Sequence, residues 1–170
     1  SHASPAGSGP PGGSTAHGAS EIMSMGAAGF GDKADSTELH FQDTMRAGRG
    51  FIDPALVRVL AEDASGRIRD LVALGVPFDR EPDGYKLIRS DFGSYARAMG
   101  VSGKTGRAFI EALADEMART GVEIDSDVSL VDLVRDADGA VSGVLAFDNR
   151  RRALVLYEAR GVVLGTGGIH

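Results

Sequence analysis

A short apolar run followed directly by a glycine cluster limits the fold of this chain more than any other stretch. Residues 162–164 (Val-Val-Leu) are typical of a strand buried on both faces, and residues 165–168 (Gly-Thr-Gly-Gly) follow at once. Such a strand ends at the carboxyl edge of a sheet, where ligands of open α/β folds bind. Glycines there let backbone N–H groups approach a bulky anion, and the threonine offers a hydroxyl. The pattern therefore indicates a phosphate or ribose contact, although it also suits an ordinary glycine-rich turn.

The composition narrows the class of protein. Charged residues make up 25% and apolar residues 42% of 170 residues, which is typical of a soluble globular domain. The net charge of -6, without a long basic run, argues against a nucleic-acid partner. Cysteine is absent, which excludes disulfides and thiolate metal sites. With no apolar run of membrane-spanning length and no signal pattern, we expect a cytoplasmic protein without membrane insertion.

The first residues differ in composition from the rest. Residues 1–11 are small residues, glycine and proline, and we predict a flexible linker or tag because they offer nothing to bury. Residues 12–170 form the folded part. Within it, residues 14–31 stay glycine-rich but include apolar side chains, which indicates an irregular loop that packs on something else.

Two helical regions are predicted in the first half. The first spans residues 36–48, with Asp35 as its N-cap. The second contains Gly66, and a glycine inside a helix costs about 1 kcal/mol relative to alanine. We therefore predict a break there, giving a pair of helices over residues 54–65 and 65–74.

A further helix is predicted over residues 105–120, capped by Thr105 and ended by Gly121. Its apolar residues recur at helical spacing on one face, which must pack on a sheet. These residues are Phe109, Ile110, Leu113 and Met117.

Strands are predicted mainly in the last third. Residues 130–134, 141–147 and 153–157 should form an antiparallel meander, because turn residues separate them. Residues 122–124 and 162–164 look like core strands of another sheet. In the middle of the chain, two short strands around a turn over residues 81–84 are an open alternative to loop, and beyond Arg89 only loop is assigned. The two candidate strands are residues 76–78 and 85–88.

Side chains that could act in catalysis or bind a metal give few indications of function by themselves. His17 follows a Ser-Thr pair and suits either a ligand contact or an exposed loop histidine. His40 precedes Asp43 by three residues, which predicts a local hydrogen-bonded pair that pins its helix. No histidine or carboxylate pair has a convincing metal spacing, and no Ser/His/Asp order stands out. We therefore predict no catalytic and no metal-ligating residue within this chain.

Six short motifs occur in the order and spacing of a known family. They are Gly12-Gly13-Ser14-Thr15, Asp35-x4-His40-x2-Asp43-Thr44, Gly75-Val76-Pro77-Phe78, Thr105-Gly106, Val141-x-Gly143-Val144 and Leu164-Gly165-Thr166-Gly167-Gly168. Taken together, they resemble the flavoprotein subunit family of fumarate reductase and succinate dehydrogenase, and L-aspartate oxidase and ketosteroid dehydrogenases are also similar. The resemblance implies an α/β protein of which this segment is α+β. The segment would be part of a Rossmann-like FAD-binding domain with a helical cluster and an antiparallel β-meander.

The resemblance also implies which residues contact FAD. The early glycine-serine-threonine loop corresponds to the family's loop around the pyrophosphate and ribityl chain, and the late cluster to the turn under the ADP half. Leu130 corresponds to a position where the backbone meets adenine. The implied cofactor-binding residues are Gly12, Gly13, Ser14, Thr15, Leu130, Gly165, Thr166, Gly167 and Gly168. Because Ser14-Thr15 stands where respiratory relatives carry an attached histidine, the implied FAD is noncovalent. Local sequence alone also suits a solvated Ser-Thr linker.

The implied activity is hydride transfer between flavin and a small carboxylate or ketone-type substrate, acting on a CH–CH bond. The family's GxGxxG strand-helix unit and its catalytic arginine have no counterpart here, so we expect the segment alone to be inactive and colourless. An alternative is a non-catalytic domain with an incomplete cofactor site that acts only with a partner chain. The exposed edge of the strand at residues 162–164 predicts self-association or a partner that supplies missing strands.

Overall fold

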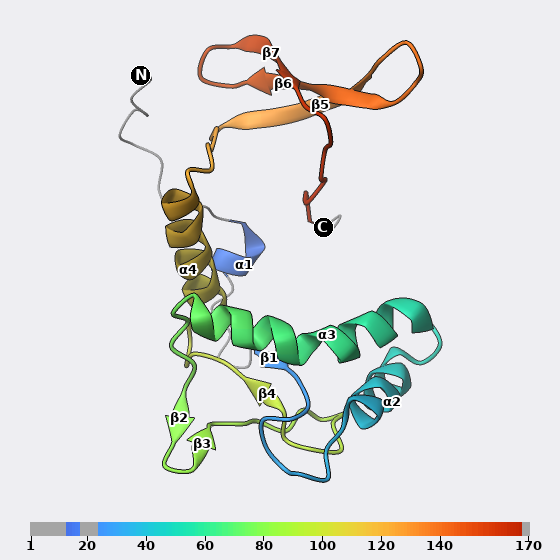
Figure 1. The fold of residues 1–170 in the computed structure, drawn as a ribbon, viewed down its shortest axis with the longest axis vertical. Helices are drawn as coiled ribbons and strands as arrows, with labels where there is room; N and C mark the ends of the chain where they lie inside the picture. Colours follow the sequence, from blue (N-terminus) through green and yellow to red (C-terminus); the bar gives the residue numbers. More distant parts are fainter. Residues whose placement is uncertain (1–12, 18–23, 168–170) are drawn as a thin grey trace. The chain divides into compact units, whose positions relative to one another are not determined.

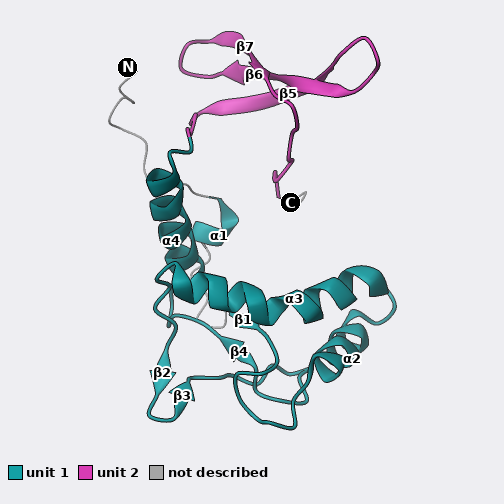
Figure 2. Ribbon diagram, in the orientation of Figure 1, with its two compact units in different colours: residues 1–122 teal, residues 123–170 magenta. Residues whose placement is uncertain are grey.

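The computed structural model describes residues 13–17 and 24–167 (Figure 1). The chain divides into two compact units, residues 1–122 and 123–170 (Figure 2), and each unit is described by itself. Helices and antiparallel strands are mixed, which confirms the α+β prediction for this segment. In the described part of the chain, no helix is long and apolar enough to cross a membrane.

Helix α2 spans Thr37–Gly48, close to its predicted bounds. Its N-cap is Ser36, whose Oγ accepts a hydrogen bond of 3.2 Å from the N–H of Leu39. The prediction that Asp35 caps this helix was wrong, because the Asp35 carboxylate binds an arginine in the interior instead. The helix ends at Arg49, which adopts a left-handed conformation.

Helix α3 is a single helix over Pro54–Ala73, so the predicted break at Gly66 was wrong. Asp53 caps it by accepting a hydrogen bond of 2.8 Å from the N–H of Ala55. Tertiary packing overrides the cost of the glycine, because the helix buries Val57, Ala61, Ala64 and Ile68 along one face that continues past Gly66.

Helix α4 spans Thr105–Thr120 and ends at Gly121, whose φ of 73° is the left-handed conformation that glycine adopts without cost. Lys104 is the N-cap and makes no side-chain cap bond, so the prediction that Thr105 caps the helix was wrong. Thr105 is the first helical residue, and its buried Oγ1 accepts from the N–H of Val101 at 2.9 Å. In the first unit, α4 packs against the short helix α1 (Ser14–His17) and, through Phe109, against Phe78.

Short antiparallel strand pairs organise the rest of the first unit. Strand β1 (Met25–Gly26) pairs with β4 (Ala98–Met99), a segment that the sequence had assigned only to loop. Strands β2 (Arg80–Glu81) and β3 (Gly84–Tyr85) form a hairpin around the predicted turn. Both strands are shorter and lie nearer to the turn than the predicted strands at residues 76–78 and 85–88.

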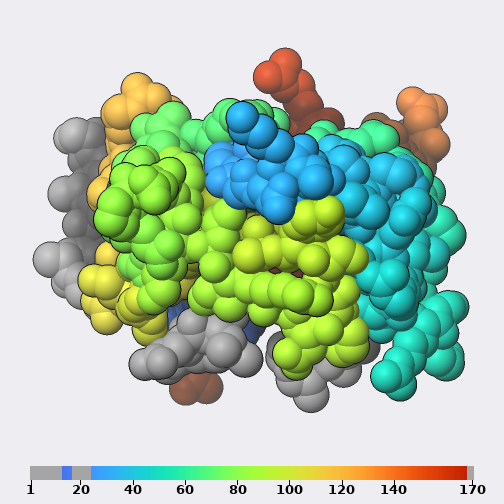
Figure 3. Space-filling view, turned by 90° about the horizontal axis from the view of Figure 1, so that it is seen from below, coloured from blue at the N-terminus to red at the C-terminus, as the bar shows by residue number. Residues whose placement is uncertain are grey.

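The core of the first unit lies among α3, the start of α4 and the β1–β4 pair. Phe78 is its aromatic centre, with ring contacts to Phe109 at 5.7 Å and Tyr85 at 6.3 Å. Figure 3 shows the segment around Phe30 beside the segment that carries Tyr85, and these two rings meet edge to face at 5.8 Å. The buried apolar residues are Ala27, Ala64, Ile68, Val76, Phe78, Met99, Val101 and Ala108.

The second unit is the predicted antiparallel meander. Strands β5 (Val128–Arg135), β6 (Val141–Asp148) and β7 (Ala153–Glu158) form one three-stranded sheet in sequence order. Turns at residues 136–139 and 149–152 join the strands, close to the predicted turns.

The two segments expected to be core strands are not strands. Residues 122–124 and 162–164 pair with no strand among the described residues. The side chains of Val122, Ile124, Val163 and Leu164 are exposed, and Val163 is 96% exposed, whereas Val162 is half-buried. A strand forms only when another backbone satisfies its N–H and C=O groups, so apolar composition alone did not make these segments strands.

Candidate functional site

The early glycine-serine-threonine segment forms an exposed corner at the start of α1. Gly13 has a φ of 103°, and a Cβ added there would meet nothing within 4 Å. The side chains of Ser14 and Thr15 are exposed, and neither hydroxyl bonds to another described residue. Within the described chain, this corner therefore offers two unengaged hydroxyls beside a backbone that a bulky ligand can approach. Gly12 lies outside the described residues.

The late glycine cluster follows β7 as an exposed segment without regular secondary structure. Gly165, Thr166 and Gly167 are all exposed, and Gly167 has a φ of 79°. A Cβ added to Gly165 would meet nothing within 4 Å, so this backbone too is open to a ligand. Gly168 lies outside the described residues.

Leu130 lies in β5, opposite Ala146 of β6, and is 43% exposed. The strand register shifts between Leu130 and Asp132, so the backbone beside Leu130 departs from a regular ladder. Gly13, Ser14 and Thr15 thus lie together in the first unit, whereas Leu130 and the late glycine cluster belong to the second. Their assignment to one nucleotide site stays a prediction.

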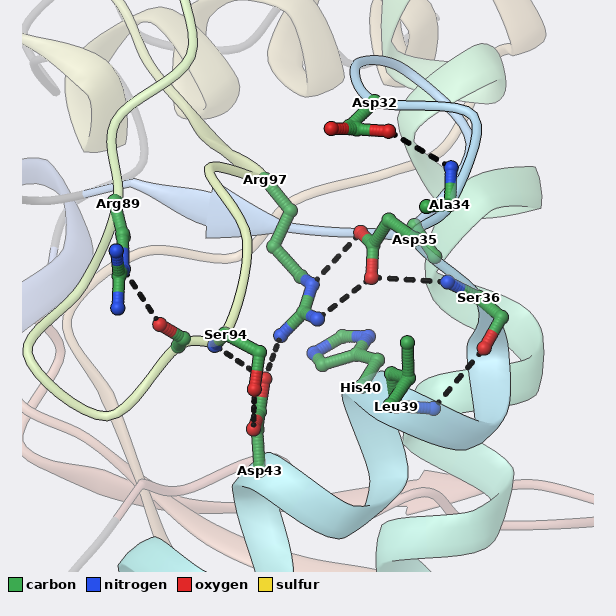
Figure 4. Close-up of polar contacts among 12 residues, drawn as sticks. Asp32, Ala34, Asp35, Ser36, Leu39, His40, Asp43, Arg89, Ser94 and Arg97 are labelled. Carbon is green, nitrogen blue, oxygen red and sulfur yellow. Dashed lines mark hydrogen bonds and ion pairs between the residues drawn. The ribbon is translucent and has the colours of Figure 1, made fainter.

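A buried ion-pair cluster, which sequence reasoning missed, joins α2 to the segment before β4 (Figure 4). The Arg97 guanidinium donates two hydrogen bonds to Asp35, of 3.0 and 2.7 Å, and one of 2.7 Å to Asp43. The exposed fractions of the Arg97, Asp35 and Asp43 side chains are 7%, 3% and 5% respectively. Charges this deep are tolerated only when paired and fully hydrogen-bonded.

Asp43 is the carboxylate of this cluster that receives the most hydrogen bonds from protein groups. Ser94 donates to it through both its backbone N–H and its hydroxyl, each at 2.7 Å, and Arg46 also contacts it. Burial raises the pKa of Asp43, but the bonds from Ser94 and Arg97 outweigh burial and lower the pKa to about 2. The bonds from Arg97 to Asp35 in turn hold the pKa of Arg97 above its usual value.

His40 does not form the predicted pair with Asp43. The His40 side chain is buried beside the cluster, and its Nδ1 has no hydrogen-bond partner among the described residues. Asp43 instead accepts from Ser94 and Arg97, which come from another part of the chain. Burial lowers the pKa of His40, and the positive charge of Arg97 lowers it further, so the ring is neutral at neutral pH.

The sequence did carry one signal for this cluster. Arg97 is a lone charge within the otherwise uncharged run of residues 93–103, and a lone charge flanked by small and apolar residues often marks a buried ion pair. Its partners could not be identified, because Asp35 and Asp43 are 62 and 54 residues away in the chain.

Comparison with known proteins decides the family. The profile of a family described as FAD binding domain matches residues 9–170. The chain belongs to this family of FAD binding domains. FAD is its cofactor, and the exposed, Cβ-free corners at Gly13 and Gly165 are compatible with a bulky dinucleotide.

Relatives of this FAD binding domain are redox flavoproteins. The chain is 38% identical over 140 residues to a fumarate reductase (CoM/CoB) subunit of Methanothermobacter marburgensis, covering 81% of this chain and 25% of that protein. It is 40% identical over 148 residues to an L-aspartate oxidase of Caulobacter vibrioides, covering 85% of this chain and 28% of that protein. The chain thus spans about a quarter of the length of these curated relatives.

The fold agrees with the same relatives. The chain superimposes with a TM-score of 0.75 on Mycobacterium smegmatis Sdh1, solved in complex with UQ1, at 27% identity. The match covers 87% of this chain and 27% of Sdh1. The FAD binding domain described here is therefore of the kind found in fumarate reductase, succinate dehydrogenase and L-aspartate oxidase oxidoreductases.

Proposed function

We propose that this FAD binding domain is a segment of an oxidoreductase that transfers a hydride between noncovalent FAD and a small carboxylate or ketone-type substrate. The family match over residues 9–170 is the observation that carries this proposal. The relatives called fumarate reductase and L-aspartate oxidase are named for small carboxylates, which supports that substrate class. When bound, the flavin supplies the redox chemistry, and the protein supplies binding and orientation.

The part that these residues play is to hold the nucleotide. The hydroxyls of Ser14 and Thr15 can donate hydrogen bonds to phosphate oxygens, and the backbone at Gly13 can lie against the ligand. The late cluster offers the same kind of open backbone at Gly165 and Gly167. We propose that these residues, with Gly12, Gly168 and Leu130, contact FAD.

Flavin content tests the proposal. The reading frame on both sides of this chain would be sequenced, and the whole encoded protein would be purified and compared with the chain alone. We expect the whole protein to be yellow with oxidised-flavin absorption that acid precipitation releases into the supernatant, and the chain alone to be colourless. A colourless whole protein that FAD does not stabilise against heat would reject the proposal.

Matched glycine variants test the site within the whole protein. Gly13→Ala should weaken FAD binding, because the new Cβ strains a backbone with a φ of 103° at the contact. Gly50→Ala introduces the same strain, at a φ of 85° with nothing within 4 Å, away from the proposed site. Ser14→Ala and Thr15→Val should each weaken binding by roughly tenfold, the expected loss of one charge-assisted hydrogen bond. Equal FAD affinity in Gly13→Ala and Gly50→Ala would argue against the assignment.

A second candidate is a domain that acts only with a partner chain. The observation that favours it is the apolar segment at residues 162–164, in which Val163 and Leu164 are exposed and which pairs with no described strand. The relative from Methanothermobacter marburgensis is named as one subunit of its enzyme, which supports assembly with other chains. Mixing the chain with separately expressed flanking segments distinguishes this candidate, since recovery of flavin binding on mixing is expected only if a partner completes the site.

A further inference from the structure

Strand β7 (Ala153–Glu158) is an outer strand of the sheet in the second unit (Figure 2). One side of β7 pairs with β6 over six consecutive residue pairs without a register shift, and the other side pairs with no described strand. The opposite outer strand, β5, has two register shifts, and such irregularities twist an edge and hinder further pairing. The outer side of β7 is therefore the edge of this sheet that can accept another strand.

The direction of the backbone groups of β7 follows from its pairing with β6. Directly after β7, the N–H of Ala159 donates a hydrogen bond of 3.0 Å to the carbonyl of Ser142 in β6. Because the backbone groups of successive residues in an antiparallel strand point alternately to its two sides, those of Leu154, Leu156 and Glu158 point to the open side. An incoming strand would bond to these residues.

The sheet of the second unit has little core of its own. Among the described residues of this unit, Ala146 is the only buried apolar residue. Along β7, Leu154 and Leu156 are exposed, whereas Val155 and Tyr157 are half-buried, so one face of the strand presents two leucines to solvent. Small sheets need further strands or a covered apolar face for stability, so this edge gains from pairing.

The two ends of β7 carry opposite charges. Arg152 lies directly before the strand and Glu158 is its last residue. Both side chains are exposed, and neither is bonded to another residue that the structure describes. Charges at an edge usually block the addition of a strand. Opposite charges at the two ends have a different effect, because an antiparallel copy of β7 brings each charge beside its opposite.

We propose that β7 pairs with β7 of a second copy of this chain, in antiparallel orientation, with Val155 on the two-fold axis. Leu154 then lies opposite the partner's Leu156, and these two residues exchange backbone hydrogen bonds, which agrees with the direction of their backbone groups. Arg152 lies opposite the partner's Glu158. The two-fold axis repeats each contact, and the two three-stranded sheets become one continuous sheet.

The charges select this register over its neighbours. Moving the axis by one residue towards the end of β7 would place Arg152 opposite Arg160 of the partner, which is repulsive. Moving it by one residue towards the start would place Arg152 opposite Leu156 of the partner and leave the guanidinium without a carboxylate. Only the axis at Val155 joins both the leucines and the opposite charges.

Charge exchange tests the interface. Sedimentation equilibrium is measured on the chain carrying Val163→Lys, so that association through residues 162–164 is suppressed, and we expect a dimer to remain. Adding Arg152→Glu or Glu158→Arg should weaken dimerisation by about tenfold or more, because each replaces two attractive pairs by two repulsive ones. Adding both substitutions to one chain, or mixing the two single variants, pairs opposite charges again and should restore the dimer.

Matched charge changes in the first unit control for net charge. Lys33→Glu and Glu62→Arg alter the charge by the same amounts, at exposed residues that bond to no other described residue. Both should leave dimerisation unchanged. A monomeric Val163→Lys chain, or a failure of the doubly exchanged chain to dimerise, would overturn the proposal.

A disulfide tests the position of the axis independently of charge. The chain has no cysteine, so Val155→Cys introduces a single thiol. Residue 155 would face its own copy in a pair without backbone hydrogen bonds, where the Cα atoms lie about 4.5 Å apart, within reach of a disulfide. We expect mild oxidation to link this variant into a covalent dimer. Ala153→Cys is the control, because Ala153 would face Tyr157 of the partner, and equal cross-linking of the two variants would reject the register.

Discussion

At the residue scale, Arg97 joins two carboxylates that are 62 and 54 residues away from it in the chain. Its guanidinium is the only described cation that binds both Asp35 and Asp43, and all three side chains are buried. Removing one partner of a buried ion pair leaves an uncompensated charge in low dielectric, which is far more costly than the pair is worth.

We therefore predict that Arg97→Met lowers the free energy of unfolding by about 3–5 kcal/mol. Arg46→Met is the matched control, because Arg46 touches the same Asp43 carboxylate but its side chain is 62% exposed, and it should cost less than about 1 kcal/mol. Urea denaturation followed by circular dichroism measures both. If both variants lose a similar amount of unfolding free energy, the burial of Arg97 does not explain its contribution to stability.

Asp43 gives the domain a response to acidic pH. Its pKa is lowered from 3.8 to about 2, so the unfolded state binds the proton more tightly than the folded state. Its contribution of about 2 kcal/mol is present above about pH 4 and should be lost as the pH falls towards about 2. The carboxyl carbon chemical shift of Asp43 measured by NMR against pH tests this, and an ordinary pKa near 3.8 would contradict it.

At the scale of elements, α3 shows how packing overrides a local preference. The glycine inside it predicted a break, yet the helix runs through Pro54–Ala73 because its buried face is continuous. Gly66 needs none of glycine's freedom, since its backbone is helical and a Cβ there would meet nothing within 4 Å.

Gly66→Ala should therefore raise the free energy of unfolding by about 0.5–1 kcal/mol, because alanine loses less backbone entropy in a helix. Gly143→Ala in β6 is the contrasting variant: its Cβ would clash with the backbone oxygen of Tyr157, so the strand pair must shift. Thermal unfolding of both variants checks the prediction. A destabilised Gly66→Ala would mean that the helix tolerates the glycine for a reason other than packing.

At the scale of the whole molecule, the exposed apolar segment at residues 162–164 has the widest consequence. It lies outside any sheet in the described chain, and an apolar segment whose backbone is not paired in a sheet can recruit other strands. Our prediction of self-association or of a partner that supplies strands rests on this segment. Sedimentation velocity over a range of concentrations can measure it directly.

We expect Val163→Lys to reduce self-association, because Val163 is 96% exposed and a charge opposes strand pairing. Phe51→Lys is the matched control, since Phe51 is 94% exposed in the first unit, in the connection between α2 and α3. If both lysine variants lower the association equally, general hydrophobicity rather than strand addition drives it. If the unmodified chain stays monomeric at high concentration, the prediction of self-association is wrong.

The sequence by itself determined the elements whose signals are local. Helix bounds near Gly48 and Gly121, the hairpin turns and the meander all follow from capping residues and from alternation over a few positions. The six motifs also identified the FAD-binding family, which the profile match confirms. Each of these signals depends on residues close together in the chain, so it can be found without knowledge of the fold.

Only the tertiary structure decided the features that join distant residues. It turned Asp35 from a helix cap into a partner of Arg97, paired β4 with β1, and left residues 162–164 outside any described strand. Each outcome depends on which backbone or charge arrives from elsewhere in the chain. Burial makes such encounters decisive, because a carboxylate or a strand edge removed from water must find a partner, and local sequence does not say which one.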